Sequence, residues 1–149
     1  MRDNKWLEDK MWFLLENHFA DVPVKNDIQI SFGRRAKQRL GSIKRRESRK
    51  VVNVFSPFRQ DKGESPSIIT ITGYFKDPKV PDFIVISTIA HELAHYAHGF
   101  SSPLEQRFEH PHLGGVVHKE LEKRGLGEMQ KEAKKWLRKN WRVYLRSSV

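Results

Sequence analysis

The chain has 149 residues and no cysteine, and its 28 lysines and arginines against 18 aspartates and glutamates give a formal charge of +10. This length suits a single domain over residues 1–149. Without cysteine the chain can form neither a disulfide nor a thiolate metal site, so a metal ion would have to be held by histidine, aspartate or glutamate. The positive charge makes DNA or another polyanion an expected partner.

Membrane and secretion segments are not expected from this sequence. Its N-terminal stretch carries charged residues every few positions, and its longest apolar run elsewhere is far shorter than a membrane span. Together with the absence of cysteine, this predicts a cytoplasmic protein without membrane contact.

Two stretches carry much of the positive charge. Residues 34–50 hold nine basic residues and one acid, and residues 131–146 hold seven basic residues and one acid. Either stretch could be only a solvated surface, but Trp136 and Trp141 among the C-terminal cations favour contact with a polyanion. The predicted nucleic-acid contacts are five residues of the first stretch, Arg34, Arg35, Lys44, Arg45 and Arg46.

In chain order, the first predicted element is an amphipathic helix over residues 4–19, where large apolar residues such as Leu7, Trp12 and Leu15 recur at helical spacing. Strands are predicted where apolar and polar residues alternate or β-branched residues concentrate, over residues 27–32, 39–45, 50–58 and 67–75. Residues 61–67 are expected to form a loop.

The second half of the chain is predicted to be helical. Pro81 is a suitable first residue for a helix that runs to about residue 98 and ends before Gly99. A second helix is predicted over residues 112–125, weakened by two glycines, and a basic third helix over residues 128–145, with apolar residues that could pack inward. The order of a helix, a β-rich region and further helices predicts an α+β fold.

The helix predicted to begin near Pro81 contains the sequence HELAH at residues 91–95. Residues four apart lie on one face of a helix, so His91 and His95 can share one metal ion. Zinc accepts imidazole nitrogen, and its catalytic sites use three protein ligands and a water molecule. Glu92 lies beside the first ligand and can take a proton from that water, which makes it the predicted general base.

The alternative is that these are ordinary polar residues on a wet helix face. However, the rest of this helix is apolar enough to be buried, and each unsatisfied polar group there would cost about 1–3 kcal/mol. His98 lies about 10 Å along the axis from His91, too far to share the ion easily, and is predicted to interact with the negative end of the helix dipole. A metzincin is excluded, because its third histidine would stand at the position of Ser101.

A third ligand must come from later in the chain, where five residues are candidates: Glu109, His110, His112, His118 and Glu120. His112 is preferred because it lies just after Pro111, near the start of the next predicted helix, where its side chain can point back across a short loop. His118 could instead be a structural histidine within that helix. A glutamate ligand, as in thermolysin-like sites, would be Glu120.

The segments TIAHELAHYAHG and HPHLGGVVHKEL resemble the SprT-like metallopeptidases and their WLM and YgjP-type relatives. In that pattern HExxH is followed, after a short variable loop, by a histidine and a large apolar residue four positions later. His112 and Val116 match the spacing, although the family residue at the second position is usually aromatic. The similarity extends over roughly residues 30–125.

This resemblance implies a minimal gluzincin-like fold, with an N-terminal helix and a small sheet packed on the HExxH helix, and a zinc-dependent peptidase activity. Some family members act on proteins bound or crosslinked to DNA, which suits the charge of this chain. The zinc ribbon of bacterial SprT is absent, so DNA contact would come from the basic stretches. An oxyanion donor is also expected, with Tyr96, Arg107 and Tyr144 as candidates.

Two other functions remain open from the sequence. A metal-dependent nuclease or RNA-processing hydrolase could use the same activated water, and a non-catalytic DNA-binding module could use the metal only to brace its fold. The RNA-processing pattern with a similar histidine spacing lacks the glutamate after its first histidine and has its third histidine six residues after the second. This chain has Glu92 and no histidine at position 101, so the peptidase is favoured.

Overall fold

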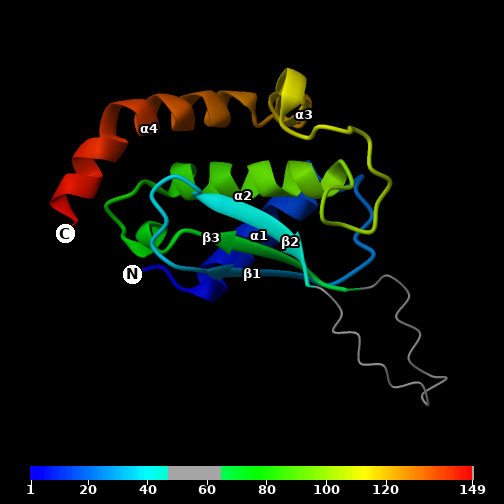
Figure 1. Cartoon of the computed structure of the whole chain (residues 1–149), viewed down its shortest axis with the longest axis horizontal. Helices are drawn as coiled ribbons and strands as arrows, with labels where there is room; N and C mark the ends of the chain where they lie inside the picture. Colours follow the sequence, from blue (N-terminus) through cyan, green and yellow to red (C-terminus); the bar gives the residue numbers. More distant parts are fainter. Residues whose placement is uncertain (47–64, 149) are drawn as a thin grey trace, which may run out of the picture.

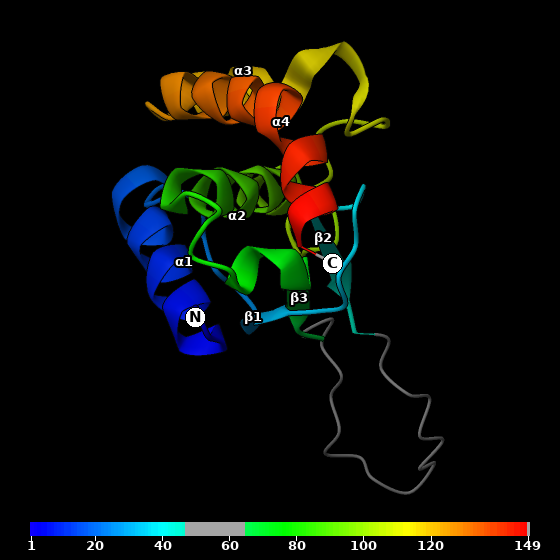
Figure 2. The same cartoon turned by 90° about the vertical axis from the view of Figure 1, so that its left-hand side faces the viewer.

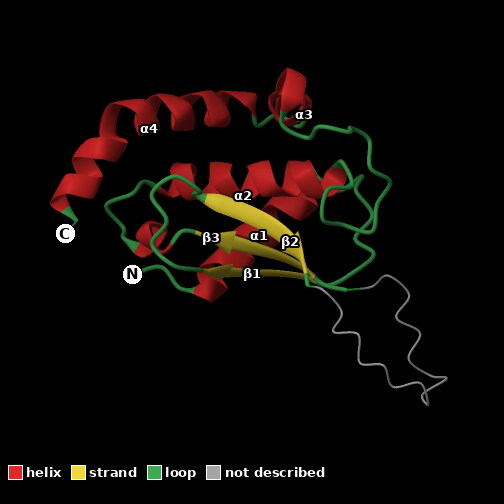
Figure 3. Cartoon of the chain, viewed as in Figure 1, coloured by secondary structure: helices red, strands yellow, loops and turns green. Residues whose placement is uncertain are grey.

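A computed structural model of the chain describes residues 1–46 and 65–148. The strand predicted over residues 50–58 and most of the loop predicted over residues 61–67 lie outside these described residues. Within them the chain forms four α-helices and one three-stranded sheet, which confirms the α+β class (Figures 1 and 3). In order these are α1 (Asn4–His18), β1 (Ile28–Phe32), β2 (Gly41–Arg45), β3 (Ser67–Ile71), α2 (Asp82–Ala97), α3 (Val116–Lys123) and α4 (Gly127–Ser147).

The sheet is mixed, with strand order β1-β3-β2. Strand β1 runs parallel to β3, and β2 runs antiparallel to it, with Gly41 opposite Ile71 and Arg45 opposite Ser67. The strand predicted over residues 67–75 was wrong in its second half, because residues from Gly73 onward turn into a short 3-10 helix, η1 (Gly73–Lys76). Since β3 occupies the centre, β2 is an edge strand of this sheet.

Helices α1 and α2 pack on one face of the sheet, α1 mainly against β1 and α2 against β2 and β3. Helix α1 is capped by Asp3, whose carboxylate accepts a hydrogen bond from Trp6 N at 2.9 Å. Its inward face is formed by Leu7, Met11, Leu14 and Leu15. Trp12, part of the predicted apolar pattern, is 45% exposed instead.

Helix α2 lies between the sheet and a second layer formed by α3 and α4 (Figure 2). Being covered on two sides, it buries most of its residues, as its apolar sequence predicts. It begins at Asp82, with Pro81 as the residue before the helix rather than its first member. The predicted inward face of α4 is confirmed, since Ala133 is buried and Trp136 packs against the same core.

The far end of α4 is tied to the rest of the fold by two aromatic side chains. Trp141 Nε1 donates to the carbonyl of Lys37 at 2.9 Å, and the Tyr144 hydroxyl donates to Asp77 Oδ2 at 3.0 Å. Across residues 1–46 and 65–148, none of the helices combines the length and apolar character needed to cross a bilayer.

Candidate metal centre

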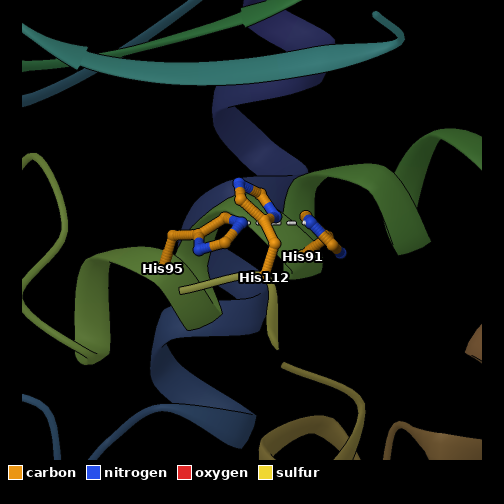
Figure 4. Close-up of side chains that lie close together, drawn as sticks. All are labelled: His91, His95 and His112. Carbon is orange, nitrogen blue, oxygen red and sulfur yellow. Dashed lines mark hydrogen bonds between the residues drawn. The ribbon is translucent and has the colours of Figure 1, made fainter. Parts of the chain in front are cut away.

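Three histidines converge beside strand β2. His91 and His95 project from successive turns of α2, and their Nε2 atoms are 3.1 Å apart. His112 approaches from the connection after α2, with its ring centroid 4.6 Å from that of His95. Donor nitrogens of all three lie within 4.8 Å of one another (Figure 4). The structure therefore brings together the three residues predicted as metal ligands.

The connection between α2 and α3 carries His112 back to α2. It leaves the helix at Gly99, whose φ of +80° and close approach to the Glu105 backbone exclude a side chain there. Arg107 N then donates to the His98 carbonyl at 2.9 Å, which holds the returning chain against the helix end. The connection ends at Gly114 and Gly115, with φ of +69° and +65°.

Those two left-handed glycines also correct a prediction. The helix expected over residues 112–125 begins only at Val116, because an α-helix does not continue through residues with positive φ. A short 3-10 turn, η2 (Leu113–Gly115), stands in place of its first residues. His112 therefore lies on a surface connection and not within a helix.

The other candidates for the third ligand lie outside the cluster formed by the described residues. His118 contacts Gln130 Oε1 at 2.8 Å and Glu122 Oε1 at 2.9 Å. Glu120 is buried and pairs with Arg124. Exposed positions are occupied by the remaining two, Glu109 and His110.

The donor set fits a metal ion. Burial, with repulsion between the imidazoles as a smaller cause, lowers the pKa of His91 to about 4 and that of His95 to about 3, so both rings are neutral at pH 7 and can donate lone pairs. Ligand bonds of about 2.05 Å in tetrahedral geometry place two nitrogens roughly 3.3 Å apart, close to the 3.1 Å between these rings. His95 Nε2 faces His91 Nε2 in the cluster, while its Nδ1 atom is buried without a hydrogen-bond partner among the described residues.

Glu92 lies beside these histidines on the buried side of α2. Burial raises the pKa of its carboxyl group to about 7, and the positive charge of Arg39 opposes that rise. A Cβ at Gly41 would stand 2.8 Å from Thr88 Cγ2 and 3.2 Å from Glu92 Oε1. Strand β2 can therefore approach the carboxyl group this closely only because residue 41 is glycine, and a glycine inside a predicted strand is the signal that could have indicated it.

Two adjoining cavities open on either side of Glu92. One, of about 390 Å³, lies along β2 and is lined by the three histidines and Phe100. A second cavity, of about 280 Å³, lies between the start of β2, α2 and α4. Both share the residues Arg39, Gly41, His91 and Glu92, so the metal centre lies in a cleft. We refer to these two cavities together as the β2 cleft.

Sequence reasoning missed several residues of this cleft. Arg39, Phe100 and Lys134 line it, but only the tertiary structure brings these parts of the chain to α2. The predicted oxyanion donors are elsewhere. The Tyr96 hydroxyl donates to Asn26 Oδ1 at 2.6 Å, Tyr144 pairs with Asp77, and Arg107 lies 3.8 Å from Glu120, so none of the three is among the described residues that line the cleft.

His98 stays outside the cluster and lies at the C-terminal end of α2, as expected, and it makes a further contact with α3. It caps the end of α2, is 3% exposed, and its Nε2 atom lies 3.3 Å from Glu120 Oε1. Burial lowers its pKa, although Glu120 opposes the shift. Through its contact with Glu120, His98 also joins α2 to α3.

The five predicted nucleic-acid contacts lie in three places. Arg34 and Arg35 follow the end of β1, near Tyr74 and Tyr144 at a separate cavity of about 490 Å³. Arg45 and Arg46 are at the opposite end of the sheet, because Arg45 pairs in register with Ser67 at the start of β3. Lys44 lines the β2 cleft. The predicted residues therefore do not form one continuous surface.

Comparison of the chain with protein-family models, with curated proteins and with solved structures finds no match. Any assignment of function therefore depends on the residues and the geometry of the site itself.

Proposed function

We propose that the protein is a zinc-dependent metallopeptidase, similar to the SprT-like family, built on a minimal gluzincin-like fold. The observation that carries this proposal is that His112 reaches His91 and His95 from outside α2, while Glu92 lies beside them in the same cleft. Three imidazole donors with an adjacent carboxyl group are a donor set that catalytic zinc sites use. The third donor is a histidine in place of the glutamate of thermolysin-like sites.

In this mechanism His91, His95 and His112 would hold the ion through their ring nitrogens. Zinc bound there would supply Lewis-acid chemistry, with a polarised scissile carbonyl and a water pKa lowered towards about 7. Glu92 accepts the proton of the attacking water and delivers it to the leaving amine. Gly41 keeps β2 from displacing the Glu92 carboxyl group.

The edge of β2 that no other described strand pairs with supports a polypeptide substrate. Four consecutive residues of this strand, 41–44, line the cleft. Side chains alternate between the two faces of a strand, so a cleft on one face would be lined by every second residue. A cleft lined by four residues in a row therefore follows the edge of the strand. An extended peptide can pair its main chain with such an edge, which would carry the scissile bond past Glu92.

Replacement of Glu92 by glutamine tests the proposal. Loss of the general base should reduce hydrolysis of an unfolded protein by about 10²–10⁴-fold, while one zinc ion per chain is still bound. Zinc content is measured by elemental analysis on the same samples. Glu122→Gln is the matched control, because Glu122 lies on the surface of α3 outside the cleft, and should retain full activity. Unchanged proteolysis by Glu92→Gln, or a wild-type protein that binds no zinc, would contradict the proposal.

A nucleic-acid hydrolase is the second candidate, because Lys44 and Arg39 add positive charge to the β2 cleft. Zinc-dependent cleavage of RNA or DNA that Glu92→Gln abolishes, without any proteolysis, would establish it. A non-catalytic DNA-binding module would instead unfold on chelation and tolerate Glu92→Gln. We also propose DNA-associated proteins as substrates, and this requires that the wild-type protein bind DNA with an affinity that falls steeply with salt.

A further inference from the structure

The β2 cleft is lined by cations from three separate elements. Arg39 precedes β2 and belongs to both cavities, Lys44 lies on β2, and Lys134 reaches the second cavity from α4. All three are exposed. Among the described residues that line the cleft, Glu92 is the only acid. Apart from this carboxyl group, the charged side chains of the lining are therefore all positive.

These three cations differ from the paired cations of the described surface. Arg2, Lys5 and Arg124 each form an ion pair with an aspartate. Within residues 1–46 and 65–148, no ion pair is found for Arg39, Lys44 or Lys134. The charge of Arg39 also acts on the nearby Glu92 carboxyl group, but none of the three is held in an ion pair, so all three can contact a ligand in the cleft.

We propose that the β2 cleft selects polypeptide segments with acidic side chains on both sides of the scissile bond, held by Arg39, Lys44 and Lys134. This inference rests on the proposed peptidase function. It names a substrate class for the same site and makes these three residues its determinants of specificity.

The spacing along β2 indicates where the acidic side chains would lie. Gly41 adjoins Glu92, so it marks the position of the reacting bond along the strand. At about 3.3 Å per residue along β2, Lys44 lies roughly 10 Å from Gly41, and Arg39 lies two residues from Gly41 in the other direction, before the strand begins. A substrate strand has the same rise, so its acidic residues would stand two or three positions from the scissile bond on each side.

Polypeptide is favoured over nucleic acid by the rest of the lining. An edge strand offers main-chain donors and acceptors at the spacing of another polypeptide, and not at the spacing of phosphodiesters. The cleft also has apolar walls, formed by Leu40, Ala133 and Leu137 in the second cavity and Ile43 and Phe100 in the first. These surfaces suit side chains of a peptide.

The test compares zinc-loaded wild-type protein with Arg39→Glu and Lys134→Glu on three labelled peptides of equal length. The peptides share their central residues and carry glutamate, glutamine or lysine at the second and third positions on each side. Each exposed ion pair between the cleft and a peptide should raise kcat/KM by roughly two- to fivefold. The wild-type kcat/KM should therefore be about tenfold higher for the glutamate peptide than for the glutamine peptide. It should be lowest for the lysine peptide. Both variants should lose or reverse this order.

Lys139→Glu is the matched control. It makes the same change of charge on an exposed residue of α4, but Lys139 lies outside the lining of the two cavities. Its preference should equal that of the wild type. If Lys139→Glu reduces the preference for the glutamate peptide as much as Lys134→Glu does, the inference is overturned. The preference would then be an effect of net charge alone.

Binding of the same peptides, and of a single-stranded DNA of similar length, to zinc-loaded Glu92→Gln separates the remaining outcomes. Cleavage without a glutamate preference overturns the inference and leaves the peptidase. Selective binding of the glutamate peptide, with no cleavage by the wild type, supports the acidic-peptide site and overturns the peptidase. Binding of DNA alone, abolished by Lys134→Glu, overturns the inference in favour of nucleic acid. No binding and no cleavage of any peptide overturn both proposals.

Discussion

Helix α2 and the connection that follows it contribute to the same cluster by different means. His91 and His95 are held at a fixed separation by the backbone of a helix that is packed between two layers. His112 lies on a surface connection, where it and the neighbouring Leu113 are exposed. One part of the site is thus organised by local backbone geometry, and the other depends on a few contacts of a surface segment. A bound ion would join the two.

The strongest test of this difference is removal of one histidine from each part. We expect His112→Ala to weaken zinc binding by more than 100-fold, since even the loss of an outer-shell partner costs about 10–100-fold. His95→Ala should weaken it further, because the remaining pair, His91 and His112, is not preorganised by a single helix. Zinc affinity is measured by competition with a chromophoric chelator.

His118→Ala serves as the control for these variants, because His118 pairs with Gln130 and Glu122 away from the cluster. It should bind zinc as the wild type does. An unchanged affinity in His112→Ala together with a loss in His118→Ala would show that the third ligand had been assigned to the wrong histidine.

Glu120 anchors the connection to both neighbouring helices. Its buried carboxylate contacts His98 at the end of α2, Arg107 in the connection and Arg124 at the end of α3. Removing one partner of a buried ion pair costs about 3–5 kcal/mol, and we expect the lower end for Glu120→Ala because Arg124 keeps Asp21 as a second partner. Urea unfolding of the metal-free protein measures this loss.

The same measurement on Glu122→Ala provides the comparison. Glu122 is exposed and its pairing with His118 lies at the surface, so its replacement should change the free energy of unfolding by less than about 0.5 kcal/mol. Equal effects of the two substitutions would show that the contacts of Glu120 do not hold the connection in place.

The smallest expected effect concerns two left-handed glycines. Gly114 and Gly125 have φ of +69° and +78°, and a Cβ at either position would meet no atom within 4 Å. Replacement of either glycine by alanine should therefore lower the free energy of unfolding by about 1 kcal/mol, through backbone strain alone. Gly114 is two residues from His112, so only Gly114→Ala should also lower zinc affinity, by a few-fold. Thermal unfolding and zinc competition together check both expectations, and a loss of zinc affinity in Gly125→Ala would show that the effect is not local to the connection.

Much of α2 and of the helices around it could be predicted from the sequence. Hydrogen bonds in a helix join residues four apart, so apolar spacing is enough to locate residues 82–97 and to place His91 and His95 on one face. Alternation located β1 in the same way, and β2 lies within the shorter strand predicted over residues 39–45. The third histidine, His112, was preferred among five candidates by its position after Pro111 and not by a periodic pattern, and it lies in the cluster.

The sequence by itself determined the local elements and the His91, Glu92 and His95 arrangement, because these depend on backbone geometry over a few residues. Only the tertiary structure decided the rest. The strand order β1-β3-β2, the return of His112 through left-handed glycines, the contact of Gly41 with Glu92, and the approach of Arg39 and Lys134 to the cleft all join residues far apart in the chain. Such contacts depend on the path of the whole chain and on the packing of its layers, which no local pattern records.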